Sequence, residues 1–221
     1  IPNTSCGPIQ GIDRGTNDGP YRWLAVLNEN HEVVQWGYDY YYMKYHNNGN
    51  RHAKGVAMNI SPEFGGMREG DYFVRIWTGY GAMWVLTKDG NLFTAGYNGY
   101  GQLGTGDTTD RYNLVKIPGL GPDATHNGLS CRISGFDFNS CTGTSMNNVS
   151  CYAIDEHGRL FTWGYNNVGQ LGIGNTTNQS RPQLVSVNNV VQVNVSQLKI
   201  LGVGKAIVEA ELEWTKNYRG K

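Results

Sequence analysis

One stretch of this sequence is written twice, and the repeat constrains the fold more than any other feature. Residues 89–109 read DGNLFTAGYNGYGQLGTGDTT, and residues 157–177 read HGRLFTWGYNNVGQLGIGNTT. Most positions are identical at an offset of 68 residues, as from Gly90 to Gly158. A chain that repeats itself at such a spacing folds as a row of similar units. Rows of this kind build extended surfaces, and such surfaces mostly bind.

Each copy predicts a strand, a turn and a second strand. In the first copy, an Asp-Gly pair lies between two short apolar runs, which is a strong signal for a β-hairpin. Glycines follow the second strand and permit the positive φ angles of a tight loop. The expected parts are Trp84–Thr87, Lys88–Asn91 and Leu92–Ala95 in the first copy, and Tyr152–Asp155, Glu156–Arg159 and Leu160–Trp163 in the second.

A degenerate third copy precedes these two. It aligns at an offset of 59 residues, and its expected parts are Leu24–Leu27, Asn28–His31 and Val33–Tyr38. The Gly-Gln-Leu-Gly loop is missing there, and an aromatic tract over residues 38–46 takes its place.

The second copy resembles the repeat of the regulator-of-chromosome-condensation family. The matching letters are LFTWGYN at 160–166 and GQLGIG at 169–174, preceded by DEHGR at 155–159. The resemblance implies a β-propeller with four-stranded blades, commonly about seven in a ring. The consensus residues are then expected in the core, namely Leu92, Phe93, Leu103, Leu160, Phe161, Trp163 and Leu171.

We therefore predict an all-β fold, a partial propeller of about three to four blades. Residues 1–20 are expected as an N-terminal extension and 21–198 as blades, divided near 21–70, 71–133 and 134–198. Residues 199–221 are expected as a C-terminal segment that could begin a further blade. So few blades do not close a seven-bladed ring. Three explanations are open: a longer polypeptide, which the missing initiator Met favours, several copies completing one ring, or an open arc against a partner.

Composition limits the partners. The 18 basic and 18 acidic residues balance to a net charge of zero, and no basic run is present, so nucleic-acid binding lacks an electrostatic basis. No apolar run reaches the length of a membrane helix, so we expect no membrane insertion. The 31 glycines and 14 tyrosines with few charges suit a virion-exposed or extracellular β protein, and equally a loop-rich propeller.

The sequence gives no sign of catalysis. It contains no nucleophile elbow, phosphate loop or zinc-protease motif, so we predict no enzyme, no catalytic residue and no cofactor. His31 and His157 fall in expected turns, and no metal site is predicted. Cys131, Cys141 and Cys151 lie in or beside an insertion, where one disulfide or free buried thiols are both compatible with the spacing.

The aromatic tract is the leading candidate for a binding surface, because Trp and Tyr dominate binding hot spots. Alternate tyrosines of the tract could instead form one buried strand face. The insertion over residues 119–148 is a second candidate, expected as a long irregular loop. The residues predicted to contact a partner are Trp36, Tyr38, Tyr40, Tyr41, Tyr42, Tyr45 and His46.

These observations predict a non-catalytic binding or structural module. The favoured setting is a phage or virion appendage, such as a tail fibre, whose partners would be a protein or glycan receptor and other subunits of the assembly. The alternative is an exchange factor or regulator of a small GTPase in the cytoplasm or nucleus. A secreted inhibitor or glycan-binding module is a third, weaker option. In the resembled family, nucleotide exchange depends on a protruding β-wedge and an acidic residue, and no segment here matches that wedge.

Overall fold

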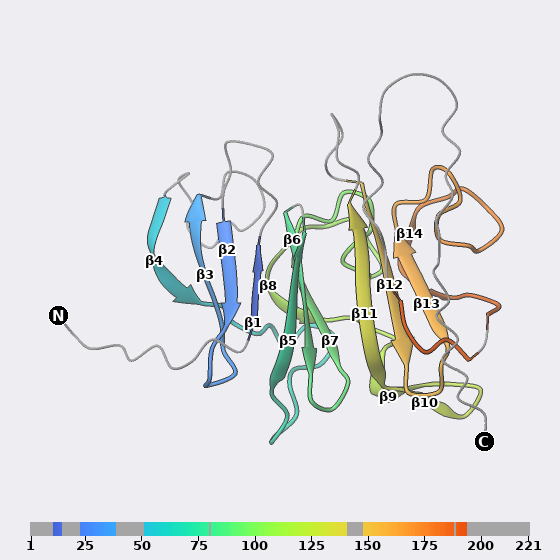
Figure 1. Cartoon of the computed structure of the whole chain (residues 1–221), viewed down its shortest axis with the longest axis horizontal. Coiled ribbons are helices and arrows are strands. Elements are labelled where there is room, and N and C mark those ends of the chain that lie inside the picture. The colour runs from blue at the N-terminus through green and yellow to red at the C-terminus, as the bar shows by residue number, and fades with distance from the viewer. Residues whose placement is uncertain are drawn as a thin grey trace, which may run out of the picture.

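Three four-stranded antiparallel sheets stand side by side in the computed structural model (Figure 1). The structure describes residues 11–14, 23–38, 51–79, 81–140, 148–187 and 189–193. Within these ranges every regular element is a strand. The all-β prediction is therefore confirmed, and the three sheets correspond to three blades of a propeller.

Each sheet follows the order of its strands in the chain. The first sheet contains β1 (Gly11–Arg14), β2 (Trp23–Leu27), β3 (Val33–Tyr38) and β4 (Arg51–Ala57). The second contains β5 (Phe73–Gly79), β6 (Ala82–Thr87), β7 (Leu92–Gly96) and β8 (Arg111–Lys116). The third contains β11 (Ile133–Ser140), β12 (Val149–Asp155), β13 (Leu160–Gly164) and β14 (Gln179–Leu184). A separate hairpin joins β9 (Gly121–His126) to β10 (Leu129–Cys131).

The repeated hairpins form as the sequence predicts. Residues 88–91 connect β6 to β7, and 156–159 connect β12 to β13. The earlier, degenerate copy forms β2 and β3 with the expected turn, and His31 adopts a φ of 61° there. Gly90 is needed for a close approach as well as for its φ of 82°, because a Cβ on it would lie 2.9 Å from the backbone nitrogen of Ile133.

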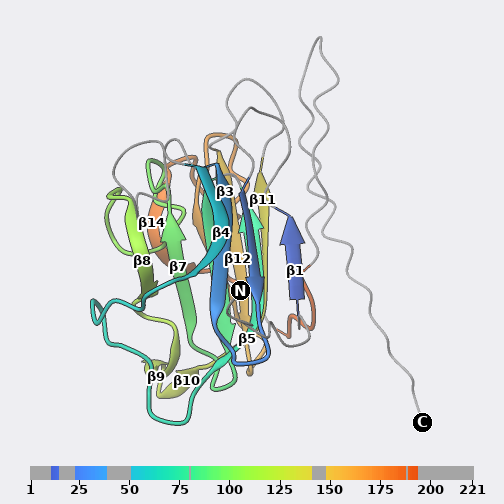
Figure 2. The same ribbon diagram turned by 90° about the vertical axis from the view of Figure 1, so that its left-hand side faces the viewer.

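Two apolar layers hold the sheets together. Figure 2 looks along the row, so that the sheets lie one behind another. The layer between the second and third sheets includes Trp84, Phe136 and Trp163. The layer between the first and second sheets includes Leu27 and Phe93. All seven predicted core residues are buried, with exposed fractions from 0% to 5%. Alternation along the strands of the second sheet therefore supplies two apolar faces, one toward the first sheet and one toward the third.

The ends of the strands define two faces of the molecule. We call one the loop face; it carries residues 97–110 after β7 and 165–178 after β13. We call the other the turn face; it carries the turns before β7 and β13 and the β9–β10 hairpin, at the lower end of Figure 1.

The insertion over residues 119–148 is not the irregular loop that the sequence predicts. It contains β9 and β10, followed by β11, the first strand of the third sheet. The expected domain boundaries stay a prediction. The strand β1 lies ahead of residue 21, inside the expected N-terminal extension, and pairs with β2.

Candidate functional site

A buried asparagine organises the loop after β7. The side-chain nitrogen of Asn98 donates to the backbone oxygens of Asp107 at 3.0 Å and Thr109 at 3.1 Å, and its side-chain oxygen accepts from the amide of Leu103 at 2.9 Å. The Asn98 amide in turn donates to the carboxylate of Asp110 at 2.8 Å. One fully buried amide thus satisfies several backbone groups that an irregular loop would otherwise leave unpaired.

The loop after β13 repeats this arrangement with neutral partners. Asn166 donates to the backbone oxygens of Asn175 at 2.9 Å and Thr177 at 3.0 Å, and accepts from Leu171 at 3.0 Å. Its amide donates to the side-chain oxygen of Asn178 at 2.8 Å. The two loops share one geometry, and the second carries amides where the first carries carboxylates.

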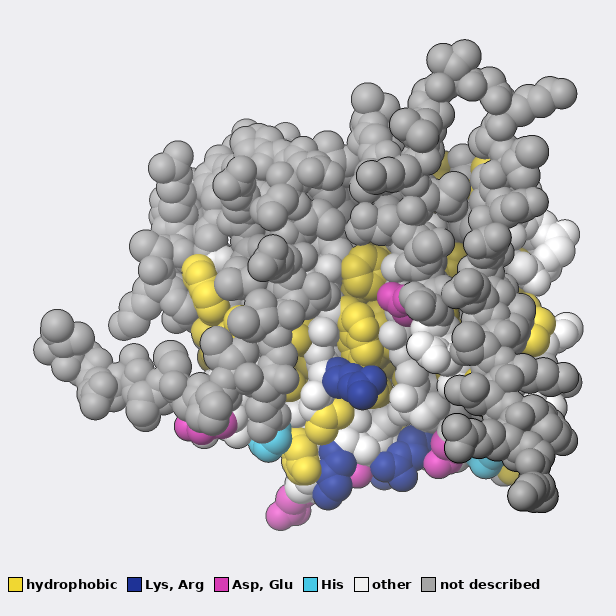
Figure 3. Space-filling view, in the orientation of Figure 1, with side chains coloured by type: hydrophobic (Ala, Val, Ile, Leu, Met, Phe, Trp, Pro, Cys, Tyr) yellow, Lys and Arg dark blue, Asp and Glu magenta, His cyan; other side chains and the backbone are white. Residues whose placement is uncertain are grey.

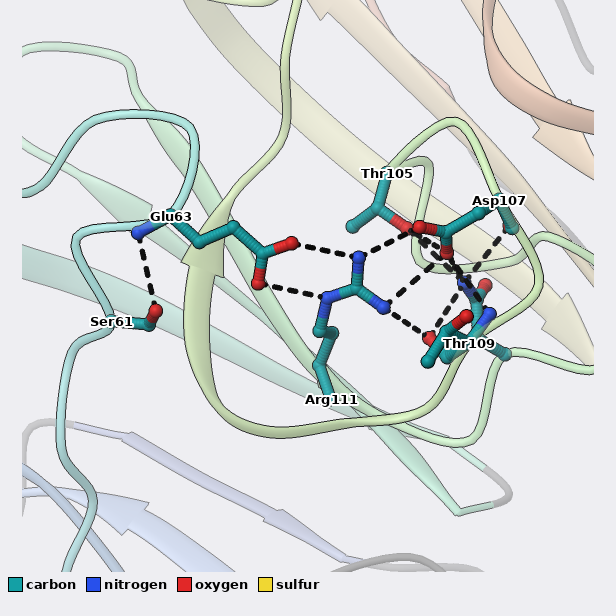
Figure 4. A network of polar contacts seen from close by, with 7 residues as sticks. Ser61, Glu63, Thr105, Asp107, Thr109 and Arg111 are labelled. Atoms are coloured by element: carbon teal, nitrogen blue, oxygen red, sulfur yellow. Dashed lines mark hydrogen bonds and ion pairs between the residues drawn. The ribbon is translucent and has the colours of Figure 1, made fainter.

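One carboxylate of the first loop, that of Asp107, pairs with Arg111, the first residue of β8, and so does Glu63 from outside the loop (Figure 4). One guanidinium nitrogen lies 2.8 Å from Asp107 and 2.9 Å from Glu63, and a second lies 3.1 Å from Glu63. Glu63 belongs to the segment joining β4 to β5, whose residue Ser61 donates its amide to the carbonyl of Leu114 on β8. Arg111 therefore ties the loop face to the connection between two sheets.

The charge of Arg111 also decides the ionisation of its partner. Burial works to raise the pKa of Asp107, but hydrogen bonds from Arg111 and the Thr109 amide, together with the charge of Arg111, outweigh it and lower this pKa. Both groups are thus held charged in the neutral pH range. This network orders the loop after β7.

A single backbone carbonyl joins the second sheet to the third. The carbonyl oxygen of Gln102 accepts from the indole nitrogens of Trp163 at 2.9 Å and Trp84 at 3.3 Å, and from the thiol of Cys151 at 3.4 Å. All these groups are buried. Burial, and secondly the charge of Asp137, raises the pKa of Cys151 well above its ordinary value, so this thiol is protonated and unreactive.

Cysteine pairing is settled for two of the four residues. Cys131 and Cys151 are free, buried thiols, and Cys6 and Cys141 lie outside the described residues. The alternative of free thiols is thus confirmed for Cys131 and Cys151.

Most of the predicted aromatic site cannot be placed. Tyr40, Tyr41, Tyr42, Tyr45 and His46 lie outside the residues that the structure describes. The two placed members lie on β3, namely Trp36, which is half-buried, and Tyr38, whose backbone pairs with Arg51. The tract thus stays a predicted binding surface.

The loop face also carries an aromatic contact that the sequence analysis did not predict. The ring of Tyr100 meets that of Tyr97 at 6.3 Å and that of Tyr165 at 5.1 Å, both edge to face. Tyr97 and Tyr165 occupy equivalent positions of the two repeats. The shared Gly-Tyr-Asn letters could have located both in advance.

The β9–β10 hairpin is a feature of the turn face that the sequence analysis missed. Its tip is Asn127-Gly128, with φ angles of 52° and 76°. Positive φ at both central residues is what a two-residue hairpin turn requires, and an Asn-Gly pair is its strongest sequence signal. That dipeptide, between two short alternating runs, could have identified the hairpin.

One arginine of the third sheet clamps this hairpin. The guanidinium of Arg159 donates to the backbone oxygens of His126 at 2.7 Å and Ser130 at 2.5 Å. It also pairs with the carboxylate of Asp155 through a hydrogen bond of 2.6 Å. Asp155 is fully buried as a side chain and Arg159 is 11% exposed, so the contact is a desolvated ion pair. The hairpin is therefore held rigidly against the third sheet.

Charged and apolar groups surround the clamped hairpin. Asp123 of β9 pairs with Arg68 and, at 3.2 Å, with Lys116. Burial, and secondly the charge of Arg68, lowers the pKa of Lys116. Leu129, beside the tip, is 47% exposed. Lys and Arg side chains gather along this lower edge in the space-filling view (Figure 3).

Two further classes of site were sought in the described part of the chain. It holds no cluster of three or more His, Cys, Asp or Glu side chains arranged to bind a metal ion. No helix among the described residues is long and apolar enough to cross a membrane.

Comparisons with known proteins agree with this architecture. The regulator of chromosome condensation (RCC1) repeat matches residues 89–127 and 157–197. The X-linked retinitis pigmentosa GTPase regulator of Homo sapiens is 35% identical over 107 residues, which are 48% of this chain and 9% of that protein. The ultraviolet-B receptor UVR8 of Arabidopsis thaliana is 28% identical over 182 residues, which are 81% of this chain and 36% of that protein. The chain thus spans only a minor part of either relative.

A solved structure supports the fold. Prp20p from Saccharomyces cerevisiae superposes with a TM-score of 0.54 and 15% identity, covering 81% of this chain and 38% of that one. These matches do not support the virion setting favoured by the composition. The repeats, the stacked four-stranded sheets and the matches together show that residues 89–127 and 157–197 are RCC1-type repeats in a chain with the fold of a partial β-propeller.

Proposed function

We propose that this chain is a non-catalytic protein-binding module that regulates a small GTPase, and that the β9–β10 hairpin is its contact surface. The observation that carries the proposal is the clamp on that hairpin. Arg159 holds two of its carbonyl groups and a buried carboxylate at once. A rigid hairpin loses little conformational entropy when it binds, and this favours affinity.

The surroundings of the hairpin suit recognition of a protein. An exposed leucine, Leu129, lies beside charged side chains that include Arg132, whose guanidinium donates to the carbonyl of Lys88 at 3.0 Å. An apolar centre within a charged rim is the usual composition of a protein interface.

The relatives point to the same class of partner. One relative is by name a GTPase regulator, and the structure of Prp20p was described together with its binding to Gsp1p and histones. By this analogy, a GTPase partner and a nuclear or cytoplasmic setting take precedence over the receptor-binding role predicted from composition. The analogy also favours a regulator over an enzyme.

A panel of small GTPases loaded with fluorescent GDP tests the proposal. We expect the purified chain to bind at least one member and to change its rate of nucleotide release. The variant Leu129→Asp should weaken that binding by about tenfold or more, because it places a charge at the apolar centre of the contact. Val168→Asp, on the loop face, is the matched control and should bind normally. No binding to any GTPase, or equal binding by the Leu129 variant, would overturn the proposal.

We propose the aromatic tract as a second contact surface. Its support is the concentration of tyrosines after β3 in place of the usual glycine loop. A triple variant with Tyr40, Tyr41 and Tyr42 changed to Ala should lose binding to a protein or glycan ligand while it melts normally. Unchanged binding by that variant would remove the tract from the site.

A further inference from the structure

The sequence contains three Asn-Gly pairs, at residues 48–49, 98–99 and 127–128, and the first lies outside the described residues. In such a pair the backbone nitrogen of the glycine can attack the side-chain carbonyl carbon of the asparagine, because glycine has no Cβ to block the approach. The asparagine then loses its side-chain nitrogen as ammonia. Whether a given pair reacts depends on how far its side chain can move and how exposed it is.

The pair that begins at Asn98 is locked in the loop after β7. Asn98 is 0% exposed, and its side-chain nitrogen donates to the backbone oxygens of Asp107 at 3.0 Å and Thr109 at 3.1 Å. Its side-chain oxygen accepts from the amide of Leu103 at 2.9 Å. These bonds must break before the side chain can turn toward the nitrogen of Gly99, so Asn98 can react only from a locally opened loop.

The pair at Asn127 and Gly128 has none of these restraints. Both residues are exposed at the tip of the β9–β10 hairpin. Within the described part of the chain, neither the Asn127 side chain nor the Gly128 amide forms a hydrogen bond. A Cβ on Gly128 would meet nothing within 4 Å, whereas one on Gly99 would collide with the ring of Tyr97. The attacking nitrogen and the amide that it attacks are therefore both accessible in the folded chain.

The tip can also change conformation without any opening of the large sheets. Leu129 pairs with His126 at the end of a short hairpin, whose register is irregular between Ser130 and Cys131. The guanidinium of Arg159 holds the carbonyls of His126 and Ser130, one on each side of the tip. The clamp thus fixes the base of the hairpin, and the turn beyond it can fray locally at a low free-energy cost.

We propose that Asn127 is a site of spontaneous deamidation, which changes the tip of the hairpin as the protein ages. The Gly128 nitrogen gives up its proton and bonds to the side-chain carbonyl carbon of Asn127, while the bond from that carbon to the amide nitrogen breaks and ammonia leaves. Water then opens the cyclic imide at one of its two carbonyls. The product is aspartate or isoaspartate, with no change of oxidation state.

The reaction alters both the charge and the shape of the tip. Either product adds one carboxylate, and isoaspartate also lengthens the main chain by one carbon. The turn has positive φ at both central residues, 52° at Asn127 and 76° at Gly128, and a longer main chain cannot keep this two-residue geometry. We therefore expect Leu129 and the clamped carbonyl of His126 to shift. An effect on binding rests on the proposed function of the hairpin, whereas the reaction itself does not.

Peptide mapping of the aged, purified chain tests the proposal without any partner. Trypsin gives the peptide 117–132, in which Asn127 is the only asparagine, and the peptide 89–111, which contains Asn98. In the folded chain, Asn127 should deamidate about a hundredfold faster than Asn98, because Asn98 must wait for its loop to open. In guanidinium chloride the two should react at similar rates. The rate at Asn127 should rise with pH, since the attacking nitrogen must lose its proton.

The products and two variants complete the test. Isoaspartate in peptide 117–132, detected with an isoaspartyl methyltransferase as reagent, identifies the imide route. Hydrogen exchange at β9–β10 should be faster in the aged chain than in Asn127→Asp, which gains the charge without the extra carbon. Asn127→Gly suits the same turn and should keep its exchange pattern on ageing.

Four results would each overturn the proposal. The first is an intact Asn127 in folded protein after an incubation in which the unfolded chain has reacted. The second is equal reaction of Asn127 and Asn98 in the folded chain, which would show that the fold does not select the site. The third is aspartate without isoaspartate, which excludes the imide. The fourth is the same hydrogen exchange in the aged chain and in Asn127→Asp.

Discussion

The indole nitrogen of Trp163 donates a 2.9 Å hydrogen bond to the backbone carbonyl of Gln102, 61 residues earlier in the chain. The bond crosses the boundary between two sheets and lies in a fully buried layer. It joins one of the residues at which the two repeats differ, alanine in the first copy and tryptophan in the second, to the loop of the first copy. The strength of this junction can be measured directly.

Changing Trp163 to Phe should lower the free energy of unfolding by about 1–2 kcal/mol, from one lost hydrogen bond and a small cavity. Trp84→Phe should cost less, because its indole lies farther from the same carbonyl, at 3.3 Å. The double variant should exceed the sum of the two, since it leaves the carbonyl with only the thiol of Cys151. Urea unfolding followed by circular dichroism checks all three; strict additivity would mean that the shared carbonyl does not couple them.

The buried asparagines of the two loops, Asn98 and Asn166, should contribute equally to the free energy of unfolding. Asn98→Ala leaves the carbonyls of Asp107 and Thr109 without their donor, and we expect a loss of about 3 kcal/mol. Asn166→Ala removes the matching bonds of the other loop and should cost about the same. Thermal melting of the paired variants tests this equivalence. A neutral result at either position would show that its loop does not depend on the amide.

Acid should lower the stability of the loop after β7, which contains Asp107, and leave the loop after β13 unchanged. The pKa of Asp107 is lower in the folded chain than its ordinary value of 3.8, so its contribution is complete above that value and is lost as the pH falls through the folded pKa. Asp107→Asn copies the residue of the other loop, Asn175. The stability gap between wild type and this variant should therefore shrink below about pH 3.8. Melting curves across the acid range test this; a gap that persists unchanged would contradict the ion pair with Arg111.

Removing the arginine clamp should release the hairpin. Arg159→Ala leaves the buried Asp155 carboxylate without its counter-ion and should cost about 3–5 kcal/mol. Hydrogen exchange should accelerate first at the β9–β10 amides, before the sheets open. Arg159→Lys keeps the charge without the fork of donors, and we expect an intermediate result. Uniform exchange over the whole third sheet would show that the arginine supports the sheet and not the hairpin.

The sequence predicted much of this molecule because its pattern is local. Alternating apolar residues around Asp-Gly and His-Gly turns predicted β6, β7, β12 and β13, and the shared letters identified the buried leucines and aromatic residues. The inserted hairpin was missed, although the Asn127-Gly128 dipeptide signals its turn, because it lies outside the repeat.

Contacts between distant segments needed the tertiary structure. Nothing in the sequence pairs Glu63 with Arg111, 48 residues away, or aims the Arg159 guanidinium at the carbonyls of His126 and Ser130. The two repeated loops also differ in their surroundings: the loop after β7 lies against the third sheet, whereas no sheet among the described residues lies against the loop after β13. Hydrogen bonds within a turn join residues that are close in the sequence, so a local pattern can predict them. The partner of a side chain at a sheet surface depends instead on which surfaces the folded sheets bring together.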